Sequence, residues 1–200
     1  MAIKFTKTTY SGHFPVFWRG ECKMLPAGYA PVQDFASGTV IPLGTLLYVN
    51  TSDLTAAVIK LADALEGSTE QEVRVAKTHL FAVGDVVTKV GDGSATVTIS
   101  SIDTSNDDYD VLTLSEAYTD LAEGDTLVES KAVESGTATS KYTPNAVVGS
   151  ACEVKDYGAV TIDAAYEAVV LYPSLDFTVP SDFLTGLCLT NNPNILFIKQ

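Results

Sequence analysis

The stretch FAVGDVV, residues 81–87, has a near copy further along the chain, LAEGDTLV at 121–128. In both, an apolar residue and an alanine precede Gly-Asp, and an apolar run follows. Glycine permits the backbone angles of a tight turn, and aspartate can accept backbone N–H bonds just before a strand. A metal or phosphate site would need further ligands at set offsets, and the sequence has neither these nor a dinucleotide or Walker motif. We interpret the repeated Gly-Asp as a strand-initiating turn rather than a binding site.

The segment around these two turns, residues 72–130, reads as a compact β unit. GDG at 91–93 is a hairpin signal and SNDD at 105–108 is typical of a turn. Short strands at this close spacing predict a small barrel or roll. The expected strands are EVRVAK, DVVTKV, SATVTISSID, YDVLTL and DTLVES.

The flanking segments, 38–50 and 132–200, are also rich in β-forming residues. Pro42 and Gly44 divide the first into two short strands, which places an edge or a corner there. In the second, PSDFLTGL predicts one helical turn opened by Ser181.

Residues 52–66, SDLTAAVIKLADALE, fit two patterns. Apolar residues recur at helical spacing, Ser52 can serve as an N-cap, and Gly67 follows the end. A strand-like alternation from Ile59 to Leu65 is also present. Periodicity alone favours a helix.

Composition and charge exclude several classes of function. Charged residues are 18% of the chain and the net charge is −13, which disfavours binding to nucleic acid or an anionic membrane. No membrane span and no secretory signal are expected. Three cysteines without a C-x-x-C motif predict buried free thiols rather than disulfides or a zinc site.

Residues 1–35 differ from the rest of the chain. Four basic and two acidic side chains give them a net charge of +2, so the other 165 residues carry −15. Seven aromatics and three prolines leave no clear period, which predicts an extended arm over a surface. Aromatic side chains bury large areas at low entropic cost, so the arm can anchor the protein to a partner. The alternative is that these aromatics cap the protein's own core.

No constellation of residues indicates catalysis, and we expect no enzyme activity, no cofactor and no metal. DTSNDDYD at 103–110 resembles a calcium loop, but Asp108 stands where glycine is needed and Leu114 where glutamate is needed. His13 and His79 lie in different segments without a carboxylate at ligand spacing. Trp18 and several tyrosines could stack on sugars. The alternative function is therefore a surface carbohydrate-binding module, with a host-surface glycan as its ligand.

Three segments together resemble the head decoration and head fibre proteins of tailed bacteriophages. SGTVIPLGTLLYV at 37–49 is similar to the hairpin that follows a basic, aromatic tail in those proteins. PNAVVGSACEV at 144–154 and YEAVVLYPSL at 166–175 are similar to their later core, and NILFIK at 194–199 to their last strand. The long insert over 67–135 favours the larger head-fibre type. The resemblance also favours strand for 57–65.

The resemblance implies a mainly β fold and a structural role in the virion. A β-tulip or roll-like body, 36–66 plus 136–200, would carry an inserted small β-barrel-like domain, 67–135, and an N-terminal docking arm, 1–35. The protein would be made in the host cytoplasm and form a homotrimer on the capsid exterior, bound to the major capsid protein. The expected docking residues are Phe14, Phe17, Trp18, Arg19 and Tyr29.

Overall fold

The computed structural model describes residues 15–26, 28–91, 93, 95–131, 138–156 and 160–199. Strands make up the secondary structure of this part of the chain, and its only helices are two 3₁₀ turns, η1 (Tyr172–Ser174) and η2 (Ser181–Phe183). The mainly β class is therefore confirmed. The helical turn expected after Pro180 is present and begins at Ser181, although no side chain caps it. None of the described helices has the length and hydropathy to cross a bilayer.

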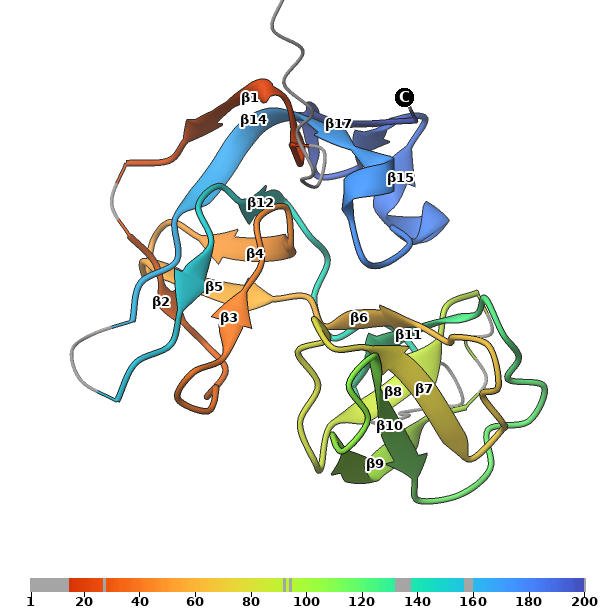
Figure 1. Ribbon diagram of the computed structural model, residues 1–200. Helices are drawn as coiled ribbons and strands as arrows, with labels where there is room; N and C mark the ends of the chain where they lie inside the picture. The colour runs from red at the N-terminus through yellow and green to blue at the C-terminus, as the bar shows by residue number, and fades with distance from the viewer. Residues whose placement is uncertain are drawn as a thin grey trace, which may run out of the picture.

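A nine-stranded sheet forms the larger part of the fold (Figure 1). Its main path runs β15-β16-β17-β14-β12-β4-β5-β2, and β1 pairs with β14 off this path. Most neighbours are antiparallel, but β14 and β17 are parallel, as are β2 and β5. The strands are β1 (Phe17–Met24), β2 (Ala30–Pro31), β4 (Leu46–Asn50), β5 (Thr55–Val58), β12 (Ala146–Val148), β14 (Ala164–Leu171), β15 (Leu184–Thr185), β16 (Cys188–Leu189) and β17 (Asn192–Ile198).

The central strands of this sheet are buried on both faces. Leu46 and Leu47 are adjacent in β4, yet they belong to two different hydrophobic clusters. Ala164 and Ala165 in β14 divide in the same way. Because successive side chains of a strand point to opposite faces, each central strand contributes to two cores. This explains why apolar residues are adjacent in β4, β12 and β14 rather than strictly alternating with polar ones.

The strands predicted between 72 and 130 form a second, six-stranded sheet, ordered β6-β11-β8-β9-β10-β7 (Figure 1). The sheet curls, so that its two end strands, β6 and β7, approach each other. The Leu65 N–H, just after β6, donates to the carbonyl of Arg74 in β7 at 2.8 Å. Val73, Ile99 and Leu112 are fully buried inside the curl. Asp92 of the predicted GDG hairpin lies outside the described residues. The strands are β6 (Leu61–Asp63), β7 (Glu72–Ala76), β8 (Val86–Lys89), β9 (Val97–Asp103), β10 (Tyr109–Leu114) and β11 (Thr126–Glu129).

The chain changes sheet at Pro42–Gly44, as the corner prediction requires. β3 (Val40–Ile41) pairs with β13 (Cys152–Glu153) in a separate two-stranded sheet, whereas β4 enters the large sheet. The two segments are therefore not hairpin partners of each other, contrary to what the resemblance implied.

The helix that periodicity favoured over 52–66 is wrong. Thr51–Leu54 is a turn in which Leu54 adopts a φ of 54°, and β5 and β6 follow in two different sheets. Between Ala56 and Ala62 every residue is buried, so the apolar spacing reflects contact on all sides rather than one helical face. The strand reading that the resemblance favoured is the one observed.

The predicted domain boundaries remain predictions. One detail differs from them, because β6 lies in the six-stranded sheet although the prediction grouped residues up to 66 with the body.

Candidate functional site

The first 14 residues, Phe14 among them, lie outside the described residues, but the rest of the predicted arm is folded. Residues Phe17–Met24 form β1, which pairs with β14, and Ala30–Pro31 form β2. This part of the predicted arm is therefore extended, as expected, but it pairs with the protein's own sheet. Arg19 and Gly20 both have positive φ values, 58° and 71°, and the register with β14 shifts between Phe17 and Cys22. This bulge breaks the period-two pattern, which is why the sequence does not reveal the strand.

Two of the predicted docking residues serve the protein's own core. Phe17 and Tyr29 are each only 2% exposed, and they belong to the two hydrophobic clusters of the nine-stranded sheet. In this fold they are not accessible to a partner, which corrects their assignment as anchors. Gly44 lets the start of the arm approach, since a Cβ there would lie 2.5 Å from a Val16 methyl group.

Trp18 and Arg19 are the predicted docking residues that reach the surface. Trp18 is 40% exposed, and the Arg19 guanidinium carbon lies 5.9 Å from the centre of its ring. Further along β1, the Lys23 ammonium lies 2.6 Å from a Glu167 carboxylate oxygen of β14. β1 thus presents an aromatic side chain among charges of both signs.

A groove of about 590 Å³ lies beside Trp18, across β1, β14 and β17. Its lining combines apolar and charged side chains: Trp18, Cys22, Glu21, Glu167, Val169 and Leu196. Sequence reasoning missed the contributions of β14 and β17. Nothing in the sequence indicates that residues about 150 and 175 positions after Trp18 share a surface with it.

The two Gly-Asp turns have the geometry that the sequence predicts. Gly84 and Gly124 have φ values of 93° and 84°. One carboxylate oxygen of Asp85 accepts the Ala82 N–H at 2.7 Å, and Asp125 makes the same bond to Ala122 at 2.8 Å. Each turn is followed directly by a strand, β8 or β11, so the interpretation as strand-initiating turns is confirmed.

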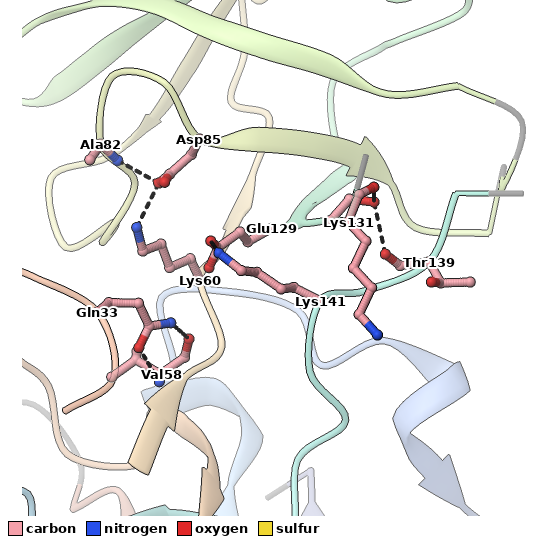
Figure 2. A network of polar contacts seen from close by, with 10 residues as sticks. Gln33, Val58, Lys60, Ala82, Asp85, Glu129, Lys131, Thr139 and Lys141 are labelled. Atoms are coloured by element: carbon pink, nitrogen blue, oxygen red, sulfur yellow. Dashed lines mark hydrogen bonds and ion pairs between the residues drawn. The ribbon is translucent and has the colours of Figure 1, made fainter. Parts of the chain in front are cut away.

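The first of these turns also carries a buried ion pair (Figure 2). Lys60, between β5 and β6, is 3% exposed, and its ammonium lies 2.7 Å from the Asp85 carboxylate. In a second ion pair, the Lys141 ammonium lies 2.5 Å from a Glu129 carboxylate oxygen. This hydrogen bond raises the pKa of Lys141. The second oxygen of Glu129 is buried without a hydrogen-bond partner among the described residues.

His79 and Asp110 come together although the sequence gives no spacing signal for it. His79 Nε2 lies 3.2 Å from Asp110, whose other oxygen lies 2.8 Å from the Lys77 ammonium. His79 Nδ1 accepts the Phe81 N–H at 3.1 Å, so Nε2 carries the proton in the neutral ring. Both ring nitrogens are engaged, and neither is free to take a proton from a substrate in the adjacent groove, which measures about 770 Å³.

This arrangement predicts a pH-dependent contribution to stability. Burial lowers the pKa of His79 below its ordinary value of 6.5, with Lys77 acting in the same direction and Asp110 and Asp85 opposing it. The unfolded chain then binds the proton more readily, so the His79 contribution is complete above about pH 6.5 and is lost as the pH falls.

His79→Asn keeps an acceptor for the Phe81 N–H but does not titrate. We expect the loss of unfolding free energy between pH 7 and pH 5, measured by urea denaturation, to be smaller in this variant than in the wild type. An unchanged loss would show that other groups carry the pH dependence.

The remaining motifs behave as turns or as isolated thiols. In the acidic loop, Asp103 accepts the Ser105 N–H and Asn106 accepts the Asp108 N–H, which are local turn bonds. The described part of the chain holds no group of three His, Cys, Asp or Glu side chains that could ligate a metal. The three cysteines are free and half-buried rather than fully buried.

Of the predicted docking residues, Trp18 and Arg19 are thus the ones at the described surface, and the groove beside Trp18 is the candidate docking surface. Comparisons with protein-family models, with curated proteins and with solved structures find no match for this chain.

Proposed function

We propose that this chain is a structural virion protein, a head decoration or head fibre protein of a tailed bacteriophage. It docks on the major capsid protein through the surface formed by Trp18, Arg19 and the adjacent groove. The observation that carries the proposal is an exposed aromatic–cation pair beside a groove, on an edge strand of a chain whose other segments are strongly acidic. Tryptophan and arginine are the residues most enriched among those that dominate binding energy at protein interfaces. The location is the capsid exterior, after synthesis in the host cytoplasm.

A homotrimer would strengthen this docking. Three copies that bind together at one symmetry point gain affinity from effective concentration, so each contact can be weak on its own. The motif resemblance supports both the trimer and the capsid partner.

Sedimentation with cognate expanded capsids tests the proposal through point variants. Deleting residues 1–35 is not a clean test, because Phe17 and Tyr29 belong to the core. We expect Trp18→Ala to weaken binding by about 30-fold, or about 2 kcal/mol, as for a central interface tryptophan.

Tyr48→Ala is the matched control, since Tyr48 is also 40% exposed but lies on β4. Equal binding of the Trp18→Ala and Tyr48→Ala variants would contradict docking through β1.

The carbohydrate-binding alternative finds less support. The aromatic residues of the 72–130 segment are Phe81, Tyr109 and Tyr118. Phe81 and Tyr118 are buried, and the Arg74 guanidinium carbon lies 4.9 Å from the centre of the Tyr109 ring. Two of the three rings are therefore buried, and a guanidinium lies against the third. Selective retention of a glycan on an array, abolished by Trp18→Ala, would favour this alternative instead.

A further inference from the structure

Strand β1 bulges where it borders the groove described above. Phe17 pairs with Val170 and Cys22 pairs with Ala168, so residues 18–21 of β1 stand opposite Val169 alone. A bulge re-aims the side chains of its strand, and bulges are common beside functional sites. The bulge of β1 therefore gives residues 18–21 directions that a regular strand would not give them.

The bulge projects an aromatic ring and charges of both signs. Trp18, Arg19 and Glu21 are all exposed, and Trp18 and Glu21 line the groove. The Arg19 guanidinium lies against the indole, and Arg19 itself keeps a φ of 58°. A positive φ is costly for a residue other than glycine, and such residues cluster at binding and catalytic sites. The shape of the bulge thus favours a binding role over a merely structural one.

Part of the groove lining is apolar. In the parallel pair of β14 and β17, Val169 lies beside Leu196, and both line the groove with Trp18. The chain buries these two aliphatic side chains only in part. An apolar side chain placed against them would remove their remaining surface from water. This part of the groove therefore suits an apolar side chain of a partner.

The charged part of the lining has one carboxylate that is not neutralised. The Lys23 ammonium lies 2.6 Å from a carboxylate oxygen of Glu167, the residue opposite it on β14. Glu21 forms no ion pair within the described part of the chain. Interfaces are arranged so that opposite charges meet, and like charges placed together exclude the wrong partner. The surface that faces Glu21 should therefore carry a cation.

The charge of the chain disfavours a second copy as that surface. Beyond residue 35 the chain carries a net charge of −15, so a facing copy would bring mostly carboxylates to Glu21. A different protein with a basic side chain at its surface would meet the opposite charge. Charge complementarity thus favours a partner of another kind, which agrees with docking on the major capsid protein.

We propose that the groove binds a segment of the major capsid protein that carries an apolar side chain next to a lysine or arginine. The apolar side chain packs between Trp18 and the pair Val169 and Leu196, and the basic side chain faces Glu21. This inference rests on the proposed docking function, and it adds the chemistry of the capsid surface that is recognised.

Sedimentation with cognate expanded capsids, at low and at high salt, tests the charge of that segment. We expect Glu21→Lys to weaken capsid binding about tenfold or more, because it places a cation opposite a cation. Glu21→Gln should weaken binding less and should make it less dependent on salt, because one attractive charge pair is gone.

Glu153 provides the matched control. It is an exposed glutamate on β13 and is not among the residues that line the groove. Glu153→Lys and Glu153→Gln change the net charge by the same amounts as the Glu21 variants, so they report the effect of overall charge alone. We expect both to bind capsids like the wild type.

The free protein shows whether the groove is already occupied. Without capsids, Glu21→Gln should keep the urea midpoint of the wild type, as for a surface residue without a partner. Glu21→Lys should keep the wild-type mass in light scattering. A lower midpoint would show that Glu21 pairs within its own chain, and a changed mass would place the groove between copies. Either result overturns the proposal.

Failure of this inference differs from failure of the docking itself. If the Glu21 variants bind like the Glu153 variants while Trp18→Ala still weakens binding, docking stands and the basic partner segment is wrong. Tighter binding of Glu21→Lys would indicate an acidic segment and would also overturn the inference. Equal binding of Trp18→Ala and Tyr48→Ala would remove docking through β1, and this inference with it.

Discussion

Replacing Asp85 by asparagine is expected to lower the free energy of unfolding by about 3–5 kcal/mol, the usual cost of removing one partner of a buried ion pair. Asparagine keeps an acceptor for the Ala82 N–H, so the turn before β8 remains satisfied. What is lost is the countercharge of Lys60, which is 3% exposed. Urea denaturation of the variant and the wild type measures the difference.

The second Gly-Asp turn supplies the control. Asp125→Asn removes the same charge from a turn of the same geometry, but its lysine partner, Lys89, lies 3.5 Å away in a more exposed setting. Pairs that water can reach contribute about 0–1 kcal/mol. Adding Lys60→Met to Asp85→Asn should recover much of the lost stability, because the buried charge is then gone. Equal costs for Asp85→Asn and Asp125→Asn would contradict a buried pair at the first turn.

Replacing Phe17 by alanine should cost about 3–5 kcal/mol, the range for deleting a buried phenylalanine side chain. Phe17 is the first residue of β1 and packs in the same cluster as Val170 and Phe197. Its loss leaves a cavity between the arm strand and the nine-stranded sheet. Thermal denaturation followed by circular dichroism measures the effect, with about 2–4 °C per kcal/mol for a chain of this size.

The adjacent residue gives the comparison. Trp18→Ala removes a larger side chain that is 40% exposed, and we expect a cost of about 0.5–1 kcal/mol. A large loss for Phe17 with a small loss for Trp18 would show that one side of β1 holds the fold while the other is available for binding. The reverse order would mean that β1 is not seated on the sheet as described.

Much of the β architecture could be predicted from local sequence. YDVLTL at 109–114 is a short run rich in β-forming residues that follows a turn signal, and it coincides with β10. The Gly-Asp turns were also predictable, because both the positive φ and the capping carboxylate are local requirements. Such features need only the residues within a few positions of each other.

Features that depend on distant contacts escaped prediction. β1 lacks a visible period because Arg19 and Gly20 form a bulge, and only its pairing with β14 defines it as a strand. The segment from Ala56 to Ala62 is buried on all sides, which removes the contrast that distinguishes helix from strand. Lys60 within this apolar run is explained only by Asp85, 25 residues later, which enters from the other sheet.

The place where the chain enters and leaves the six-stranded sheet has a consequence for variation among related chains. Leu61 of β6 pairs with Val128 of β11, so the two ends of this segment are neighbours in one ladder. A stretch whose ends lie side by side can be lengthened, shortened or exchanged while the remaining strands keep their pairing. The nine-stranded sheet would then act as a constant platform, and the segment between 61 and 128 as the part that selection is free to replace.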